Sequence, residues 1–448
     1  MDISGQNILI IGLGKTGIAA ARFLAKRKAK VIVTDQKTEA EIADTLAEMR
    51  NEGIPIDIAP YDISALHGID MVIPSPGVPP HDALLSAAVG KNIPIHSELE
   101  VACRYLRPPM VAITGTNGKT TTTTLTGRLL ADAGKKVFVG GNIGIPLIQY
   151  CDGPQDEDLV VVEVSSFQLQ WVTAFHAHCA ALLNTTCDHV NYHGSFAAYQ
   201  EAKERVFLNQ NENDRAILNA DEDYTLELSK RLKAKTFFFS STRDVAPGFS
   251  IRSGSLVLSG FGKNDEIYPL DMIKIPGLHN IENVMTAIMA ARICDCPPDR
   301  IIQTISEFRG IAHRIEFVDE KQGVAYYDDS KGTNVGAVVR ALETFRNPVI
   351  LLLGGRDKDG DFETLAPLIR ERVKTLILFG EARERINEKL GGLVETDIQP
   401  TLRSALVTAR NRAQGGDVVL LSPGCASFDE FTDYKDRGNF FQAMVKTF

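Results

Sequence analysis

Short runs of β-branched and other apolar residues alternate with helical patterns along almost the whole chain. The runs are apolar at consecutive positions, as expected for strands that helices cover on both faces. Gly, Pro or Asp follows most of them, where a strand gives way to a helix. This alternation predicts an α/β fold built on parallel sheets. The expected strands are Ile8–Ile11, Val31–Thr34, Met71–Ile73, Val111–Thr114, Val137–Val139, Leu159–Val164, Ala180–Leu183, Ala325–Tyr327, Val349–Leu353, Thr375–Phe379 and Val418–Leu421.

The length of the chain predicts several domains. At roughly 150 residues per domain, 448 residues correspond to about three. Pro108 and Pro109 precede a new strand, which indicates a linker after about residue 99. The segment from Phe308 to Arg314 follows a helix and precedes a new series of strands, which indicates a second boundary near residue 310. We therefore expect domains at residues 1–99, 100–310 and 311–448.

One section of the central region interrupts the alternation of strands and helices. From about Phe237 to Ile275 the sequence has short β-type pieces separated by turns, at Ser250–Leu258 and Ile267–Ile275. Such short pieces are typical of antiparallel strands. We expect a small antiparallel excursion on a larger α/β domain.

Charge and composition exclude several classes of protein. Lys and Arg number 48 and Asp and Glu 57, so the net charge is −9, and a general nucleic-acid binder would instead need a basic face. The apolar runs fall far short of the ~20 residues that span a bilayer, and no basic stretch precedes the first of them. Seven cysteines without a Cys-x-x-Cys pair indicate reduced thiols. We therefore expect a cytoplasmic protein without a membrane anchor or secretory signal.

A glycine loop, Gly12-Leu-Gly14-Lys-Thr-Gly17, follows the first expected strand and precedes a helical pattern. Its glycines allow a tight turn and a close approach of a phosphate to the helix N-terminus. Asp35 ends the next strand and could accept hydrogen bonds from a ribose or a base. The loop therefore favours a nucleotide-like ligand, as in a dehydrogenase. The alternative is a turn that only packs a helix on a strand.

A second glycine loop, Gly115-Thr-Asn-Gly118-Lys119-Thr120-Thr121, lies between another buried strand and a threonine-rich helix. Backbone N–H groups there can bind phosphates, Lys119 supplies a cation and Thr120 a magnesium ligand. The loop is a shortened variant, because the glycine of a full motif is replaced by Ile113. A helix start without a ligand is the alternative. Two nucleotide sites favour an ATP-using enzyme with a nucleotide-linked substrate over a dehydrogenase.

Acidic and basic residues near the ends of neighbouring strands are candidate metal ligands. Glu163 ends a buried strand and could bind magnesium, or could cap the next helix. Asp188 and His189 end the following strand, and His189 could contact a metal or a phosphate. Lys203 falls in a helical pattern that by itself predicts an ordinary surface lysine.

Together these segments resemble the Mur ligases of peptidoglycan synthesis, and the resemblance runs from end to end. The family-like segments are Gly115–Thr121, Gly140–Gly144, Glu163–Leu169, Asp188-His189, Gly277–Asn283, His313-Arg314 and Asp329–Asn334. Four others are most similar to the family member that adds D-glutamate: Gly12–Gly17, Ser75–Val78, Leu351–Phe362 and Leu421–Ser427.

The resemblance implies a three-domain enzyme with a Rossmann-like N-terminal domain, a central P-loop-type NTPase domain and a Rossmann-like C-terminal domain. The family's UDP-substrate ligands match Lys15, Thr16, Asp35, Gln36, Gly77, Asn142 and His189. Its ATP ligands match Gly115, Thr116, Asn117, Gly118, Lys119, Thr120, Thr121, Asn280, Asn283, Arg314, Asp329 and Lys331. Its D-glutamate ligands match Thr333, Lys358, Ser427 and Tyr434.

The resemblance also implies the metal ions and the reaction. Lys203 matches a lysine that carries a carbamate, so that Thr120 and Glu163 would hold one Mg²⁺ and His189 and modified Lys203 a second. Lys119, His189 and Lys203 are the implied catalytic residues. The implied reaction joins D-glutamate to UDP-N-acetylmuramoyl-L-alanine through an acyl phosphate, with ATP consumed. The implied enzyme is a monomer that needs no nucleic acid or membrane partner.

Three other functions stay open at this stage. One is a related ligase that adds a different amino acid, or glutamate to folate. The second is a nucleotide-dependent oxidoreductase that uses Gly12–Gly17, although it would leave Gly115–Thr121 without a role. The third is a non-catalytic nucleotide-binding module, which would leave the candidate metal ligands unexplained.

Overall fold

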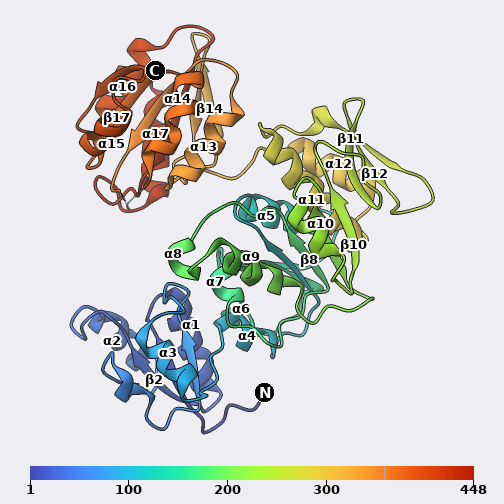
Figure 1. The fold of residues 1–448 in the computed structure, drawn as a ribbon, viewed down its shortest axis with the longest axis vertical. Helices are drawn as coiled ribbons and strands as arrows, with labels where there is room; N and C mark the ends of the chain where they lie inside the picture. The colour runs from blue at the N-terminus through green and yellow to red at the C-terminus, as the bar shows by residue number, and fades with distance from the viewer. Residues whose placement is uncertain (358–359) are drawn as a thin grey trace. The chain divides into compact units, whose positions relative to one another are not determined.

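The computed structural model describes residues 1–357 and 360–448, so the predicted D-glutamate ligand Lys358 lies outside the described residues. Three separate sheets form, with helices between most consecutive strands (Figure 1). The predicted three-part α/β fold is therefore confirmed.

Over the described residues, no helix combines the length and the apolar composition needed to cross a membrane. All seven cysteines are free thiols, as expected.

The first sheet has four parallel strands in the order β3-β2-β1-β4. The order reverses at β1, and α/β sheets bind ligands outside the carboxyl ends of the strands at such a point. The elements are β1 (Asn7–Ile11), α1 (Lys15–Lys26), β2 (Lys30–Thr34), α2 (Ala43–Asn51), β3 (Ile56–Ile58), η1 (Ile63–Leu66), β4 (Met71–Pro74) and α3 (Ala83–Gly90).

The central sheet has nine strands in the order β13-β12-β11-β10-β9-β8-β5-β7-β6. The predicted antiparallel excursion is confirmed at β11-β12-β13, but these strands extend the main sheet, because β10 and β11 pair in parallel. The prediction over Ile267–Ile275 was too long, since the strand stops at Pro269 and a 3₁₀ turn follows. The strands are β5 (Met110–Thr114), β6 (Val137–Gly141), β7 (Leu159–Glu163), β8 (Cys179–Leu182), β9 (Arg215–Asn219), β10 (Lys235–Phe239), β11 (Gly248–Arg252), β12 (Ser255–Ser259) and β13 (Glu266–Pro269).

Helices and short turns surround this central sheet. They are α4 (Glu98–Cys103), α5 (Lys119–Asp132), α6 (Leu147–Tyr150), α7 (Ser166–Leu169), α8 (Val190–His193), α9 (Phe196–Glu204), η2 (Arg205–Phe207), α10 (Asp223–Ser229), η3 (Leu270–Met272), α11 (Leu278–Ile293) and α12 (Pro298–Glu307).

The third sheet has six strands in the order β14-β15-β19-β16-β17-β18. The edge pair β14-β15 is antiparallel, and the other pairs are parallel. The elements are β14 (Glu316–Lys321), β15 (Val324–Asp328), α13 (Val335–Thr344), β16 (Val349–Gly354), η4 (Phe362–Leu365), α14 (Ala366–Arg372), β17 (Val373–Phe379), α15 (Arg383–Leu390), β18 (Glu395–Ile398), α16 (Leu402–Arg412), β19 (Val418–Gly424) and α17 (Tyr434–Lys446).

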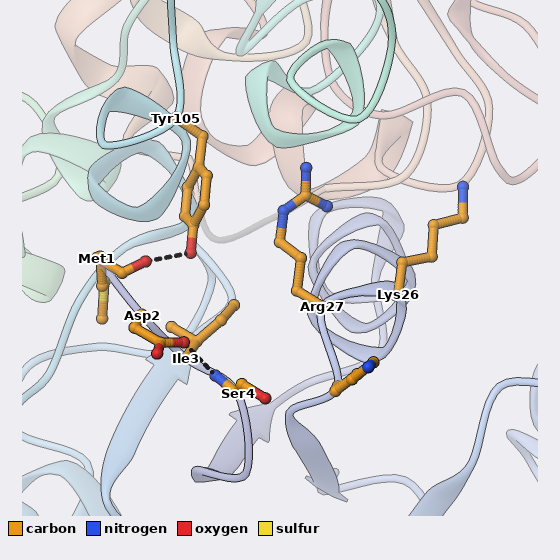
Figure 2. A pocket seen from close by; sticks show the side chains of 8 residues that line it. Met1, Asp2, Ile3, Ser4, Lys26, Arg27 and Tyr105 are labelled. Carbon is orange, nitrogen blue, oxygen red and sulfur yellow. Dashed lines mark hydrogen bonds between the residues drawn. The ribbon is translucent and has the colours of Figure 1, made fainter.

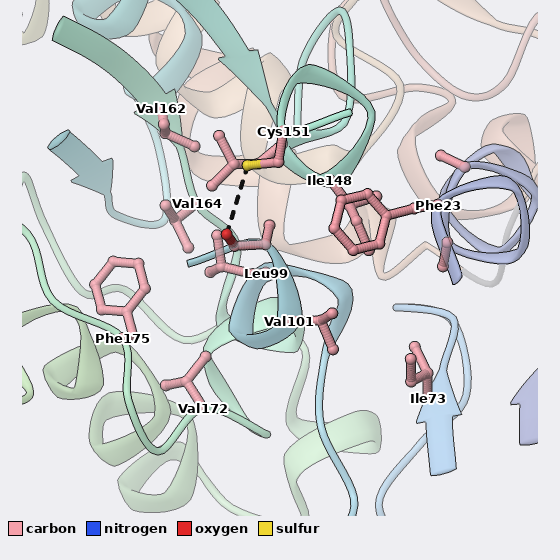
Figure 3. Close-up of a cluster of buried hydrophobic side chains, with 14 of the residues drawn as sticks. Phe23, Ile73, Leu99, Val101, Ile148, Cys151, Val162, Val164, Val172 and Phe175 are labelled. Carbon is pink, nitrogen blue, oxygen red and sulfur yellow. Dashed lines mark hydrogen bonds between the residues drawn. The ribbon is translucent and has the colours of Figure 1, made fainter. Parts of the chain in front are cut away.

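The chain divides into two compact units, and the first unit contains both the first and the central sheet. The first unit comprises residues 1–272 and 281–306, and the second comprises residues 273–280 and 307–448. One cluster of buried side chains joins the two sheets of the first unit (Figure 3). Phe23 of α1, Leu99 of α4 and Val162 of β7 all belong to it. The boundaries predicted at residues 99 and 310 stay predictions.

Polar contacts join the same two sheets near the start of the chain. The Arg27 guanidinium bonds Asp152 at 3.0 Å and lies 3.4 Å from the ring centroid of Phe23. The Tyr105 hydroxyl donates to the Met1 carbonyl at 2.6 Å, beside a cavity of about 450 Å³ (Figure 2). These contacts fix α1 to the neighbouring helices, so the first glycine loop has a set position relative to the central sheet.

A buried carboxyl group, Glu98, lies in the link between these two sheets. Ser97 caps α4, and Glu98 Oε1 accepts from the Ile148 N–H at 2.6 Å. Glu98 Oε2 is buried without a hydrogen-bond partner. Burial raises the pKa of Glu98 to about 7. The folded chain therefore binds this proton more tightly than the unfolded chain does.

We predict that Glu98→Gln removes a loss of stability that occurs as the pH rises from about 5 to 7. With the pKa raised, the contribution of Glu98 is complete below its unfolded value of about 4.3 and is lost as the pH rises through about 7. The variant keeps an oxygen for Ile148, so its stability relative to the parent should rise by up to about 3 kcal/mol between pH 5 and 8. Thermal unfolding at several pH values measures this, with exposed Glu212→Gln as control. Parallel pH curves for parent and Glu98→Gln would contradict the prediction.

Candidate active site

The loop between β5 and α5 has a backbone that only glycine adopts easily. Gly115 has φ +156° and Gly118 has φ +85° at the N-cap of α5. A Cβ on Gly118 would lie 2.1 Å from Asn283 Oδ1, so no larger residue fits without displacing that side chain. The loop therefore brings the N-terminus of a 14-residue helix to the end of a buried strand, where backbone N–H groups can bind phosphate.

The loop is held in place by the segment that follows β8. Asn184 contributes twice, since its carbonyl accepts from Thr116 N at 2.9 Å and its side-chain Oδ1 accepts from Asn117 N at 2.8 Å. Thr116 Oγ1 lies 2.9 Å from the Tyr199 hydroxyl of α9. These bonds come from elements on either side of the loop, so its shape does not depend on a bound ligand.

Two lysine side chains converge on one carbonyl of this loop. Lys119 Nζ donates to Gly115 O at 2.9 Å, and Lys203 Nζ donates to the same oxygen at 2.8 Å. Lys203 is 1% exposed, so the helical pattern that predicted a surface lysine was wrong. Its position follows from Tyr199, whose ring centroid lies 4.6 Å from Lys203 Nζ and one helical turn before it.

Electrostatics at this point disfavour the charged ammonium form of Lys203. Burial lowers the pKa of Lys203 well below its usual value, and the charge of Lys119 lowers it further. Asp188 and Glu163 oppose this shift without cancelling it. A neutral amine is the form that can react with an electrophile.

Glu163 has the environment of a magnesium ligand. It is 2% exposed at the end of β7, and its Oε1 accepts from Asn142 Nδ2 at 2.8 Å. Its Oε2 is buried and has no hydrogen-bond partner. Thr120, with 8% exposure, lies in the first turn of α5. Because a hard cation prefers oxygen ligands, the orphaned carboxylate oxygen fits Mg²⁺.

His189 belongs to an aromatic group that the sequence did not indicate. It has φ +52° at the N-cap of α8, and its ring centroid lies 4.7 Å from that of Phe167. Tyr192 packs on the same Phe167 ring at 4.2 Å, and His193 packs there at 5.7 Å. Partial burial lowers the pKa of His189, and burial lowers that of His193 to about 4. The helical spacing of Tyr192 and His193 after His189 was the only available signal.

The first glycine loop has the geometry expected for a phosphate ligand. Gly12 has φ +91°, and a Cβ on Gly17 would lie 2.1 Å from the Gly12 carbonyl oxygen. Ser75 Oγ donates to the same carbonyl at 2.8 Å and so ties the loop after β4 to it. Lys15 and Thr16 begin α1, and Lys15 Nζ donates to the carbonyl of Gly144. Gly77 follows in the loop after β4.

Asp35 acts first as a structural acceptor for this loop. Its Oδ2 accepts from Leu13 N at 2.7 Å, and its Oδ1 accepts from Lys37 N at 2.9 Å. The adjacent Gln36 donates to the Tyr61 hydroxyl at 3.3 Å. Asp35, Lys37 and Tyr61 line a cavity of about 560 Å³ between the ends of β2 and β3. A ribose or base could enter this cavity beside Asp35.

The second unit carries most of the other predicted ligands. Asp329 is buried, bonds Ser422 Oγ at 2.7 Å and has its pKa raised to about 7 by burial. Lys331 Nζ lies 5.6 Å from the ring centroid of Tyr434, the first residue of α17. Other predicted ligands within this unit are Asn280, Arg314, Thr333 and Ser427. Asn280 Nδ2 donates to the Pro276 carbonyl at 2.6 Å.

Arg437, which the sequence did not indicate, holds two of these segments together. Its buried guanidinium donates to the carbonyls of Ser330 at 2.8 Å and Cys425 at 3.1 Å.

In the same unit, ligand atoms of His313, Glu316 and Asp328 lie within 4.8 Å of one another. His313 Nδ1 lies 2.7 Å from Asp328 Oδ2, which makes this group an internal hydrogen-bonded network.

The structure therefore gathers the predicted residues into groups within each unit. The first unit brings together Gly115, Thr116, Asn117, Gly118, Lys119, Thr120, Thr121, Asn142, Glu163, His189, Lys203 and Asn283 around the second loop. Lys15, Thr16, Asp35, Gln36 and Gly77 lie at the carboxyl ends of the first sheet.

Three protein-family models match the chain, one in each third. Residues 6–97 match the Mur ligase MurD-like N-terminal domain, residues 113–291 the Mur ligase middle domain and residues 313–425 the Mur ligase glutamate ligase domain.

Solved structures share the fold at low identity. A pseudomurein peptide ligase type C from Methanothermus fervidus is 18% identical with a TM-score of 0.59, covering 99% of this chain and 100% of that one. UDP-N-acetylmuramate-alanine ligase MurC from Thermotoga maritima is 18% identical with a TM-score of 0.57, covering 98% and 99%.

Curated relatives match over the full length. A UDP-N-acetylmuramoylalanine–D-glutamate ligase from Syntrophus aciditrophicus is 59% identical over 100% of this chain and 99% of its own. A protein of the same name from Geobacter metallireducens is 43% identical over 99% of this chain and 98% of its own. With family models over most of the chain and relatives at this identity, the chain belongs to the Mur ligase family.

Proposed function

We propose that this protein is the ATP-dependent ligase that joins D-glutamate to UDP-N-acetylmuramoyl-L-alanine in peptidoglycan precursor synthesis. The observation that carries the proposal is the phosphate loop, where Lys119 and buried Lys203 converge on one carbonyl. The 59% identity to a relative of that name supports the choice of amino acid. We expect the enzyme to act as a cytoplasmic monomer, with the domain limits predicted above.

The chemistry follows from the poor reactivity of a carboxylate. The alanyl carboxylate is anionic and lacks a leaving group, so it must first be activated. Transfer of the γ-phosphoryl group of ATP to it gives an acyl phosphate and ADP. The amine of D-glutamate then attacks the acyl carbon, and the tetrahedral intermediate collapses to the amide and phosphate. The first step brings two anions together, so the site must offset their repulsion.

The residues around the second loop have separate roles in this scheme. Lys119 and the N-terminus of α5 bind the phosphates of ATP. Thr120 and Glu163 would hold one Mg²⁺, and His189 with carbamylated Lys203 would hold a second. Bound Mg²⁺ neutralises charge that develops on the transferred phosphoryl group. The low pKa of Lys203 supports the carbamate, because only a neutral amine reacts with CO₂.

The other predicted ligands complete the substrate sites. Lys15, Thr16, Asp35, Gln36 and Gly77 would surround the uridine diphosphate, with Asn142 and His189 toward the muramoyl end. Asn280, Asn283, Arg314, Asp329 and Lys331 would bind ATP. Thr333, Lys358, Ser427 and Tyr434 would bind D-glutamate.

We predict that phosphate release is fastest with D-glutamate. Purified protein would receive ATP, Mg²⁺, UDP-N-acetylmuramoyl-L-alanine and one amino acid at a time. Release should be at least about tenfold faster with D-glutamate than with L-glutamate, glycine or L-lysine, because a site built for one stereoisomer leaves polar groups unpaired with another. Equal turnover with L-glutamate would contradict the proposed specificity, and reduction of NAD⁺ would favour an oxidoreductase.

We predict that Glu163→Gln weakens magnesium binding without unfolding the protein. The variant keeps the oxygen that accepts from Asn142 but loses the charge of the orphaned carboxylate. The Mg²⁺ concentration at half-maximal rate should rise about tenfold or more. Binding of Mn²⁺, followed by electron paramagnetic resonance, gives a readout that does not depend on activity. The matched control is Glu157→Gln, two residues before the start of β7. Equal Mn²⁺ affinity in both variants would exclude Glu163 as a metal ligand.

We predict that Lys203→Ala loses most activity and recovers part of it in added short carboxylates, which replace the carbamate. Nuclear magnetic resonance in ¹³C-bicarbonate should show one carbamate signal in the parent that is absent from the variant. Lys235→Ala, at the exposed start of β10, is the control. Full activity of Lys203→Ala without added carboxylate would exclude the residue from the mechanism.

A further inference from the structure

A hydrogen bond joins the loop after β4 to α8, the helix that directly follows His189. The Tyr192 hydroxyl donates to the Val78 carbonyl at 3.0 Å. Val78 directly follows Gly77 in the loop after β4, and Tyr192 lies in α8. Both residues belong to the first unit. The bond therefore links the proposed UDP site to the segment that carries His189, a proposed metal ligand.

His189 directly precedes α8, so the contacts that hold this short helix also set the position of His189. The helix comprises four residues, and the N–H groups of Tyr192 and His193 donate to the His189 carbonyl at 3.0 and 3.1 Å. None of its residues is buried. A helix of this length is not stable by itself, so contacts with its surroundings must hold it.

Those contacts come from the ring of Phe167 in α7 and from Tyr199 of α9, whose ring centroid lies 5.4 Å from that of His193. His189, Tyr192 and His193 all pack on the Phe167 ring, with centroid distances of 4.7, 4.2 and 5.7 Å. His193 Nε2 also bonds Ser166 Oγ at 3.0 Å. The segment that carries Phe167 continues from Glu163, so the rings place α8 against the end of β7.

We propose that Tyr192 is a positioning residue that couples the two sites. When UDP occupies the loops that contain Gly12 and Gly77, the Val78 carbonyl is held in place, and its bond to Tyr192 then orders α8 and His189. This inference rests on the proposed function, because it requires that UDP binds at the first sheet and that His189 takes part in the reaction. Tyr192 need not touch the substrate or the metal.

The size of the expected effect follows from the strength of one hydrogen bond. Such a bond shifts a local equilibrium about three- to tenfold. The effect should appear in the order of α8 and in kcat, because His189 acts during the reaction. The KM for ATP should change less than about twofold, since Lys119 bonds the carbonyls of Gly115 and Thr116 whereas the Tyr192 hydroxyl bonds Val78.

We predict that Tyr192→Phe uncouples α8 from UDP binding. Hydrogen exchange would be followed with and without UDP in two peptides, residues 12–24 and residues 186–194. In the parent, UDP should slow exchange in both peptides about threefold or more. In Tyr192→Phe, UDP should slow exchange only in residues 12–24, and kcat should fall about three- to tenfold. The ring still packs on Phe167, so the melting temperature should stay close to that of the parent.

Tyr268→Phe is the matched control, since it removes a hydroxyl that bonds Glu266 at 2.6 Å elsewhere in the same unit. It should behave as the parent does. Slowing of residues 186–194 by UDP in Tyr192→Phe would overturn the proposal, as would no slowing of that peptide in the parent. If Tyr192→Phe has a lower melting temperature than the parent, Tyr192→His provides another side chain with a hydrogen-bond donor. Slowing of residues 186–194 by UDP in Tyr192→His would support the role of the hydrogen bond, and no slowing there at the parent's melting temperature would contradict it. No slowing of residues 12–24 in the parent would instead contradict the proposed UDP site.

Discussion

One continuous hydrophobic core holds the first and central sheets together, and the arrangement of both glycine loops depends on it. Side chains from α1, α4, α6 and β7 all contribute to this cluster. Hydrophobic contacts are not directional, so they do not fix the relative position of the two sheets precisely. The directional hydrogen bonds of Arg27 with Asp152 and of Glu98 with Ile148 help to fix it. The proposed UDP site and the phosphate loop at Gly115–Thr121 therefore lie in one compact unit.

Within that unit, the second loop concentrates positive charge where it cannot be hydrated fully. Lys119 and Lys203 share the Gly115 carbonyl, and burial makes a second ammonium unfavourable there. Glu163 presents the opposite situation, a buried carboxylate oxygen with no donor. Both features are costly in an isolated protein and become favourable when anionic phosphates and a cation are present. A lysine pair and an unpaired carboxylate oxygen in the same buried region therefore indicate a ligand site and not a hydrophobic core.

The sequence indicated the buried strands more reliably than the edge strands. All expected strands formed, because continuous apolar runs are distinctive of parallel strands covered on both faces. Polar strands at sheet edges, such as β14 and β18, were not expected, since charged residues there resemble loops. Central strand β9 was also missed, although three of its five residues are apolar. In the site, Phe167, Tyr192 and His193 were missed because no chemical motif marks an aromatic contact.

The α/β class, the two glycine loops and the residue types that can bind phosphate and magnesium could all be predicted from the amino-acid sequence. Those features depend on neighbours in the chain, because strand, turn and helix N-terminus follow one another directly. The burial of Lys203 against Gly115 and the bond from Tyr192 to Val78 became visible only in the folded chain. Each of these pairs joins residues far apart in the chain, so their contact depends on how the sheets and helices pack and leaves no local pattern to read.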